Sequence, residues 1–158
     1  MRVTASQLVI GLALVLAIPA CGGPDTSSSD PASPAAATAD LQATFTGNLT
    51  VSATTVSVGT PFTVTQTATN LTGAQVGPLI VGIRRLGFTV LAAQKPRTGV
   101  CRIAGSATCN FVELQPFETQ SYTLTLAATT PGTYQLQGWT TSSYVSGGYS
   151  GSVTINVQ

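Results

Sequence analysis

The chain contains no histidine, and charged residues make up only 7% of its 158 residues. Histidine is the commonest general acid and base near neutral pH, so its absence removes the group that most enzymes of this kind use. The two carboxylates after residue 40, Glu113 and Glu118, flank a predicted turn, and the Ser and Thr side chains have no evident base to activate them. We therefore predict a protein that is not an enzyme and binds no cofactor and no metal ion.

The chain also lacks an apolar run long enough to cross a bilayer, which needs about 20 residues. Leu8–Ile18 is the longest uninterrupted apolar run, and it follows the positive charge of Arg2. A run of this length is typical of the core of a secretion signal. We interpret residues 1–20 as a signal peptide.

The apolar run leads into Ile18-Pro19-Ala20-Cys21. These residues resemble the lipobox of bacterial lipoproteins, in which an aliphatic residue and two small residues precede an invariant cysteine. Ile18, Ala20 and Cys21 match that pattern, and Pro19 departs from it. The resemblance implies that Cys21 receives diacylglycerol and anchors the chain on the exported face of the cell membrane or the outer membrane. The alternative is an ordinary cleaved signal beside a chance cysteine.

Residues 21–40 are rich in Pro, Ser and other small residues and show no apolar periodicity. Such a stretch cannot bury enough surface to offset the entropy of ordering. We expect a disordered linker, spanning roughly 25 Å, between the lipidated cysteine and a folded domain.

Period-two alternation of apolar and polar residues recurs from residue 41 to the end, with turn signals between the stripes. The pattern predicts an all-β fold: an immunoglobulin-like antiparallel β-sandwich of about seven strands over residues 41–158. Threonines such as Thr63 and Thr65 are expected on the wet face, and Gln66 is an odd polar member of an apolar stripe. The apolar members of the stripes are Leu49, Val51 and Ala53; Phe62, Val64 and Ala68; Leu79, Val81 and Ile83; Phe88 and Val90; Tyr122, Leu124 and Leu126; Tyr134 and Leu136; and Val153, Ile155 and Val157.

The last two strands are predicted to form a hairpin. A two-residue turn at Ser146-Gly147 would place Tyr144 opposite Tyr149 and Leu136 opposite Val157, with the apolar residues of both strands on one face. In that register Trp139 points outward.

Cys101 and Cys109 are equidistant from Gly105, so a hairpin with its apex there places them opposite each other. Zinc binding would need two further ligands, and a redox pair usually has C-x-x-C spacing. We predict a structural disulfide, as expected for an exported chain.

Strand and turn signals also carry a resemblance that covers about half of the chain. The region from Val58 to Tyr134 is similar to the immunoglobulin-like repeat domains of unknown function in bacterial cell-surface proteins, relatives of the cell-adhesion-related domains. The resemblance implies a non-catalytic surface module. That family usually has Gly where this chain has Val112 and Phe117, and an Asp-x-Leu-Pro element that this chain lacks. The matching residues are Val58-Gly59, Phe62–Thr65, Ala68–Asn70, Cys101, Thr108–Asn110, Leu114, Pro116, Glu118, Tyr122–Leu126 and Pro131–Tyr134.

Two groups of residues could bind a partner. Five basic residues form a cluster that could meet anionic headgroups or an acidic polymer, or could simply keep a Thr-rich surface soluble. Five basic residues are too few for the dense positive surface that binds nucleic acid, so we expect no nucleic-acid partner. Trp139 could stack on a sugar, whereas Tyr144 and Tyr149 are expected to cap the core as a cross-strand pair, and Tyr134 to form a tyrosine corner. The basic cluster consists of Arg84, Arg85, Lys95, Arg97 and Arg102.

The sequence thus predicts a membrane-anchored surface or periplasmic lipoprotein with a non-catalytic interaction module. Its partners would be the membrane, through the lipid on Cys21, and an envelope protein. The alternative is a carbohydrate- or polyanion-binding module that uses Trp139 or the cluster from Arg84 to Arg102.

Overall fold

The structure is a computed structural model, and it describes residues 43–158. The predicted signal peptide, the lipidation site Cys21 and the linker up to residue 40 lie outside the described residues.

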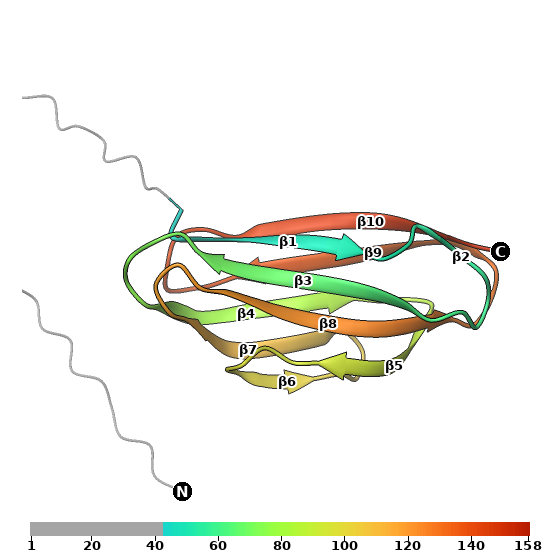
Figure 1. Ribbon diagram of the computed structural model, residues 1–158, viewed down its shortest axis with the longest axis horizontal. Helices are drawn as coiled ribbons and strands as arrows, with labels where there is room; N and C mark the ends of the chain where they lie inside the picture. The colour runs from blue at the N-terminus through green and yellow to red at the C-terminus, as the bar shows by residue number, and fades with distance from the viewer. Residues whose placement is uncertain (1–42) are drawn as a thin grey trace, which may run out of the picture. The chain divides into compact units, whose positions relative to one another are not determined.

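Residues 43–158 form two sheets that pack face to face, and they contain no helix (Figure 1). One sheet has the strand order β1-β3-β8-β5 and the other β2-β10-β9-β4-β7-β6. All paired strands are antiparallel except β2 and β10. The all-β sandwich is therefore confirmed. The strands are β1 (Phe45–Val51), β2 (Thr55–Val56), β3 (Phe62–Asn70), β4 (Val76–Arg84), β5 (Phe88–Gln94), β6 (Val100–Arg102), β7 (Ala107–Leu114), β8 (Thr119–Ala128), β9 (Gly132–Thr141) and β10 (Tyr149–Val157).

Residues 43–158 form ten strands where about seven were expected, because β2, β6 and β7 have no stripe of their own in the sequence. In β7 the irregular register against β4 interrupts the alternation. β2 has two residues and β6 has three, too few to show alternation in the sequence. Each predicted stripe does contribute inward residues to one core, which both sheets line. The partly exposed threonines of β3 lie on the opposite face, where Thr65 and Thr123 hydroxyls bond at 2.9 Å and Thr69 and Thr119 do the same.

Gln66 is fully buried and joins the two sheets. Its amide Nε2 donates to Thr140 Oγ1 in β9 at 3.0 Å and to the Thr67 carbonyl at 3.1 Å. Thr140 Oγ1 in turn donates to the Thr67 carbonyl at 3.2 Å. Through its Nε2 donor, the polar residue in an apolar stripe thus links the two layers, whereas its buried Oε1 has no hydrogen-bond partner among residues 43–158.

The predicted register of the last hairpin is wrong by four residues. Tyr149 pairs with Thr140, and Val153 pairs with Leu136, so residues 142–148 form a loop instead of a two-residue turn. The loop is longer because it closes over the start of β1: the Thr44 amide donates to the Ser146 carbonyl at 2.9 Å, and a Cβ at Gly147 would overlap Phe45. An even shift keeps every side chain on its predicted face.

The turn from β7 to β8 holds a phenylalanine in a conformation that favours glycine. The Glu118 amide donates to the Gln115 carbonyl at 3.0 Å, and Phe117 between them has φ of 57°. A turn with Pro116 first and positive φ second is of type II, which usually requires Gly at that second position. The resemblance identified this position as Gly in the related domains, and the backbone explains why. The other expected Gly position, Val112, lies next to Phe111, which has φ of 60°.

We expect Phe117→Gly to be more stable than Phe117→Ala by about 1 kcal/mol, because only Gly relieves the positive φ. The Phe117 ring is 71% exposed, so both variants lose little packing. Urea unfolding of the two variants measures the difference, and equal midpoints would show that the turn stores no strain.

Candidate functional site

The candidate site lies on the outer face of the six-stranded sheet, around Trp139. Gly138 and Thr140 point into the core, so Trp139 between them points outward, as predicted. Trp139 pairs with Ser150 on β10 and with Gly82 on β4. Directly paired residues share a face of the sheet, so this row carries one large side chain between two small residues.

The row continues to the sheet edge and ends on an arginine. Gly82 pairs with Thr108 on β7, and Thr108 pairs with Arg102 on β6. Thr108 lies between two fully buried residues and therefore faces outward. Arg102 must then share the outer face with Trp139.

Trp139 rests directly on the backbone of β4. A Cβ added at Gly82 would overlap the six-membered part of the indole, so only glycine allows this packing. One face of the ring is thereby covered by the sheet, and Trp139 as a whole is half-buried. The missing side chain at residue 82 fixes the ring flat against the strand.

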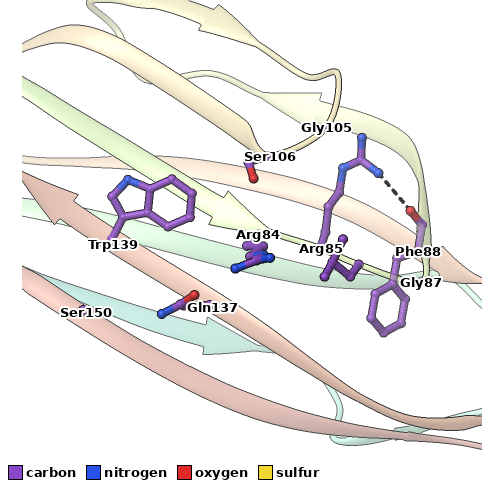
Figure 2. A pocket seen from close by; sticks show the side chains of 10 residues that line it. Arg84, Arg85, Gly87, Phe88, Gly105, Ser106, Gln137, Trp139 and Ser150 are labelled. Atoms are coloured by element: carbon purple, nitrogen blue, oxygen red, sulfur yellow. Dashed lines mark hydrogen bonds between the residues drawn. The ribbon is translucent and has the colours of Figure 1, made fainter.

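An open groove of about 690 Å³ adjoins the indole. Figure 2 shows Trp139 at one side of the groove, with Arg84, Gln137 and Ser106 around its middle and Gly87 and Phe88 at its far end. Arg84 follows Gly82 by two residues, pairs in register with Gln137, and is exposed on the same face. The groove thus combines an aromatic ring, a cation and an amide.

Within residues 43–158, Arg84 and Arg102 have no acidic partner. The two carboxylates there are otherwise engaged: Glu118 pairs with Arg97 at 3.0 Å, and Glu113 accepts a hydrogen bond from Gln75 at 3.1 Å. Both arginines are exposed, so their charges are available to an external anion.

Arg85 has a structural role, although it borders the same groove. Its guanidinium donates to the Phe88 carbonyl at 2.9 Å (dashed in Figure 2) and to the Ile103 carbonyl at 2.7 Å. These bonds tie the β4–β5 turn to the β6–β7 loop. In Figure 2 the side chain extends toward Gly105 and away from Arg84.

The remaining cations of the predicted cluster lie elsewhere. Arg97 forms the ion pair with Glu118, and Lys95 follows β5 of the other sheet. The five basic residues therefore do not form one surface. Only Arg84 and Arg102 are brought to the face that carries Trp139.

The two tyrosines of the aromatic group are separated, and the predicted cross-strand pair is wrong. Tyr149 faces inward and packs against the core, whereas Tyr144 is 78% exposed in the β9–β10 loop. Tyr144 borders a second hollow, of about 290 Å³, with Ile80 and Phe111. The sequence did not single out these last two residues. Phe111 points outward because a register irregularity between β4 and β7 adds one residue to β7 at this point.

Tyr134 behaves as predicted for a tyrosine corner. Its hydroxyl donates to the Thr130 carbonyl at 3.1 Å, four residues upstream, and its ring packs edge-on against Phe88 at 5.2 Å. The predicted disulfide is also confirmed: Cys101 and Cys109 are paired in register and bonded. It links β6 to β7 and so fixes the strand that carries Arg102.

The family is decided by the match of residues 49–157 to the BatD DUF11-like domain. The chain belongs to the BatD DUF11-like domain family. The match covers nearly the whole sandwich and includes the region from Val58 to Tyr134 on which the resemblance was based. It supports the prediction of an immunoglobulin-like domain of the kind found in cell-surface proteins.

Solved structures with a similar fold are distant in sequence. A CARDB domain from Pyrococcus furiosus has a TM-score of 0.45 and 15% identity over 73% of this chain and 86% of that one. A cohesin module of a Clostridium perfringens glycoside hydrolase has a TM-score of 0.48 and 10% identity over 73% and 99%. These similarities extend to general architecture alone. No curated protein matches the chain.

Within its described part, the BatD DUF11-like domain holds no group of three or more His, Cys, Asp or Glu residues placed to bind a metal ion. Nor do residues 43–158 include a helix that is long and apolar enough to span a membrane. The chemistry that the domain does present is the ring, amide and arginines of the outer face.

We expect Gly82→Ala to displace the indole and to destabilise the domain by about 1–3 kcal/mol, as overpacking does. Trp139 is the only tryptophan in the chain, so its emission reports this ring alone. The emission should shift to longer wavelength as the ring leaves the sheet. Ser150→Ala, which also changes a neighbour of Trp139, is the matched control and should leave emission and stability unchanged. An unshifted spectrum in Gly82→Ala would contradict this packing.

We expect Glu118→Gln to lower stability at neutral pH and to flatten its dependence on pH. The Arg97 guanidinium, and next the Gln115 amide, hold the pKa of the Glu118 carboxyl below its ordinary value. A lowered folded-state pKa stabilises the fold above the unfolded pKa, and the stabilisation is lost as pH falls through the folded pKa. The stability gap between wild type and Glu118→Gln should therefore close below about pH 4 in thermal melts.

Glu113→Gln is the control for this experiment, because Glu113 accepts a hydrogen bond from an amide and not from a cation. A gap of constant size at every pH in Glu118→Gln would contradict the role of the carboxylate charge.

Proposed function

We propose that the chain is an exported lipoprotein, anchored through diacylglycerol on Cys21, whose BatD DUF11-like domain acts as a non-catalytic interaction module at the cell envelope. The lipid places the protein on the exported face of the cell membrane or the outer membrane. The segment of residues 21–40 separates the anchor from the domain. The sandwich meets an envelope partner with its outer sheet face.

The observation that carries the export step is the Cys101–Cys109 disulfide. Disulfides persist in oxidising compartments outside the cytosol. The bond joins the edge strand β6 to its neighbour β7, and residues 43–158 hold no group of residues placed to bind a metal ion. Its position is therefore that of a structural disulfide. Export agrees with the apolar run Leu8–Ile18 and with the lipobox pattern that ends at Cys21.

The interaction role is supported by the distribution of polar groups on the domain. The two carboxylates within residues 43–158 are engaged by Arg97 and Gln75, which leaves no paired carboxylates facing a cleft. By contrast, the outer sheet face presents an aromatic ring beside unpaired cations. Such a surface can bind without supplying a catalytic acid, base or nucleophile.

We expect the mature protein, expressed as the full chain in a lipoprotein-processing bacterium, to begin at residue 21 with a diacylglyceryl thioether on its sulfur. Mass spectrometry of the N-terminal peptide measures both properties. Cys21→Ser should move the protein from the membrane fraction to the soluble fraction. A Cys101→Ser/Cys109→Ser double variant, which keeps Cys21, is the matched control and should stay in the membrane fraction. A mature chain that begins elsewhere, or a free thiol at residue 21, would overturn the anchor.

A further inference from the structure

We propose that the outer face of strands β9, β4, β7 and β6 binds an acidic polysaccharide, with a sugar ring stacked on Trp139 and uronate carboxylates held by Arg84 and Arg102. The inference rests on the proposed function, because it names the partner of the interaction module. It assigns a binding role to three residues that share one face only after folding.

One face of the Trp139 ring is accessible to a ligand. Gly82 covers one face of the indole, and the ring borders the open groove, so the other face is available to a ligand. The paired neighbour on β10 is Ser150, which has a small side chain. A flat aromatic surface with small polar neighbours suits the apolar face of a sugar ring, whose hydroxyls stay in water.

The two arginines are spaced to meet a polymer that stacks on Trp139. Arg102 lies three strands from Trp139 in the same row, which is about 14 Å at the usual separation of strands. Arg84 lies between them, one strand from Trp139 and two residues further along β4. The three side chains therefore span more than one sugar unit, and a polymer with repeated carboxylates can reach all of them.

The two arginines also supply positive charge to this face. Arg84 and Arg102 are exposed and have no acidic partner within residues 43–158. Guanidinium groups bind carboxylates through two parallel hydrogen bonds, which gives geometric preference as well as attraction. Gln137, paired with Arg84 across the strand, offers a donor and an acceptor for sugar hydroxyls.

The chemistry of the face favours a glycan over a protein partner. The centre of a protein interface is usually rich in apolar and aromatic side chains. Around Trp139 the groove has Ser106, Gln137 and Ser150 instead. Its other apolar lining residues, Leu86 and Phe88, lie in and just after the β4–β5 turn, and Ile80 and Phe111 border the other hollow. At the Trp139 end of the groove, one ring among polar groups can bind a sugar but offers little apolar surface to a protein.

The test uses the purified mature lipoprotein in detergent micelles, titrated calorimetrically with oligogalacturonate and with oligomannuronate. Methyl-esterified oligogalacturonate keeps the sugar rings and removes the charges, and polyphosphate keeps charge and removes the rings. We expect a uronate oligomer to bind, to change Trp139 emission, and to bind at least tenfold more tightly than the ester or polyphosphate.

The variants separate the two contacts. Trp139→Ala should weaken uronate binding at least tenfold, and Trp139→Phe, which keeps an aromatic ring on Gly82, should weaken it less. Arg84→Gln with Arg102→Gln should also weaken binding at least tenfold and remove most of its dependence on salt. Lys95→Gln, an equal loss of charge per residue outside this face, should leave affinity unchanged. Circular dichroism melts show that each variant is folded.

Four results would overturn the inference: no binding of either uronate, equal affinity for the methyl ester, equal affinity for polyphosphate, or full affinity in Trp139→Ala. They are distinct from failure of the proposed function, which the mass of the N-terminal peptide decides. A lipidated Cys21 without uronate binding leaves the anchor standing and removes this partner. Uronate binding by a chain without lipid on Cys21 supports this partner and overturns the anchor.

Discussion

Two missing side chains, at Gly138 and Gly82, allow the close contacts on which both the core and the surface site depend. A Cβ at Gly138 would overlap the Gln66 amide, which crosses between the sheets to Thr140. A Cβ at Gly82 would overlap the indole of Trp139. Because residues 138 and 139 are consecutive in β9, one short piece of strand makes the link between sheets on its inner side and the aromatic surface on its outer side. The orientation of the ring is therefore coupled to the packing of the sandwich.

Alternation along a strand is a local property, so the sequence predicts faces well and partners poorly. Trp139 was expected to point outward, and it does, although the predicted hairpin register was four residues in error. An even shift preserves which side each residue occupies. The shift does change which residue lies opposite on the paired strand. Trp139 lies opposite Ser150, and Tyr144 lies in the loop and is not paired with Tyr149. Loop length is set by contacts with β1, which no pattern near residue 146 encodes.

The same limit applies to the basic cluster. Nearness in sequence suggested one positive patch from Arg84 to Arg102, but β4 and β5 belong to different sheets and successive residues of a strand point to opposite sides. Arg84 and Arg85 are consecutive, and one is exposed on the outer face while the other bonds to loop carbonyls. Conversely, Trp139 and Arg102 come into one row through three successive strand pairings. The cysteines could be paired from the sequence because a hairpin between them is short and symmetric about Gly105.

The low charge of the chain has a further consequence for its surface. Threonine hydroxyls replace charged groups on the wet face of the four-stranded sheet, as the bonds between Thr65 and Thr123 and between Thr69 and Thr119 show. Carboxylates are consequently scarce, and those within residues 43–158 are already used by Arg97 and Gln75. In a protein of ordinary composition an exposed arginine usually has acidic neighbours that reduce its field. Here Arg84 and Arg102 lie beside an aromatic ring and have no acidic partner within residues 43–158, so the shortage of acids leaves this face open to an anionic partner.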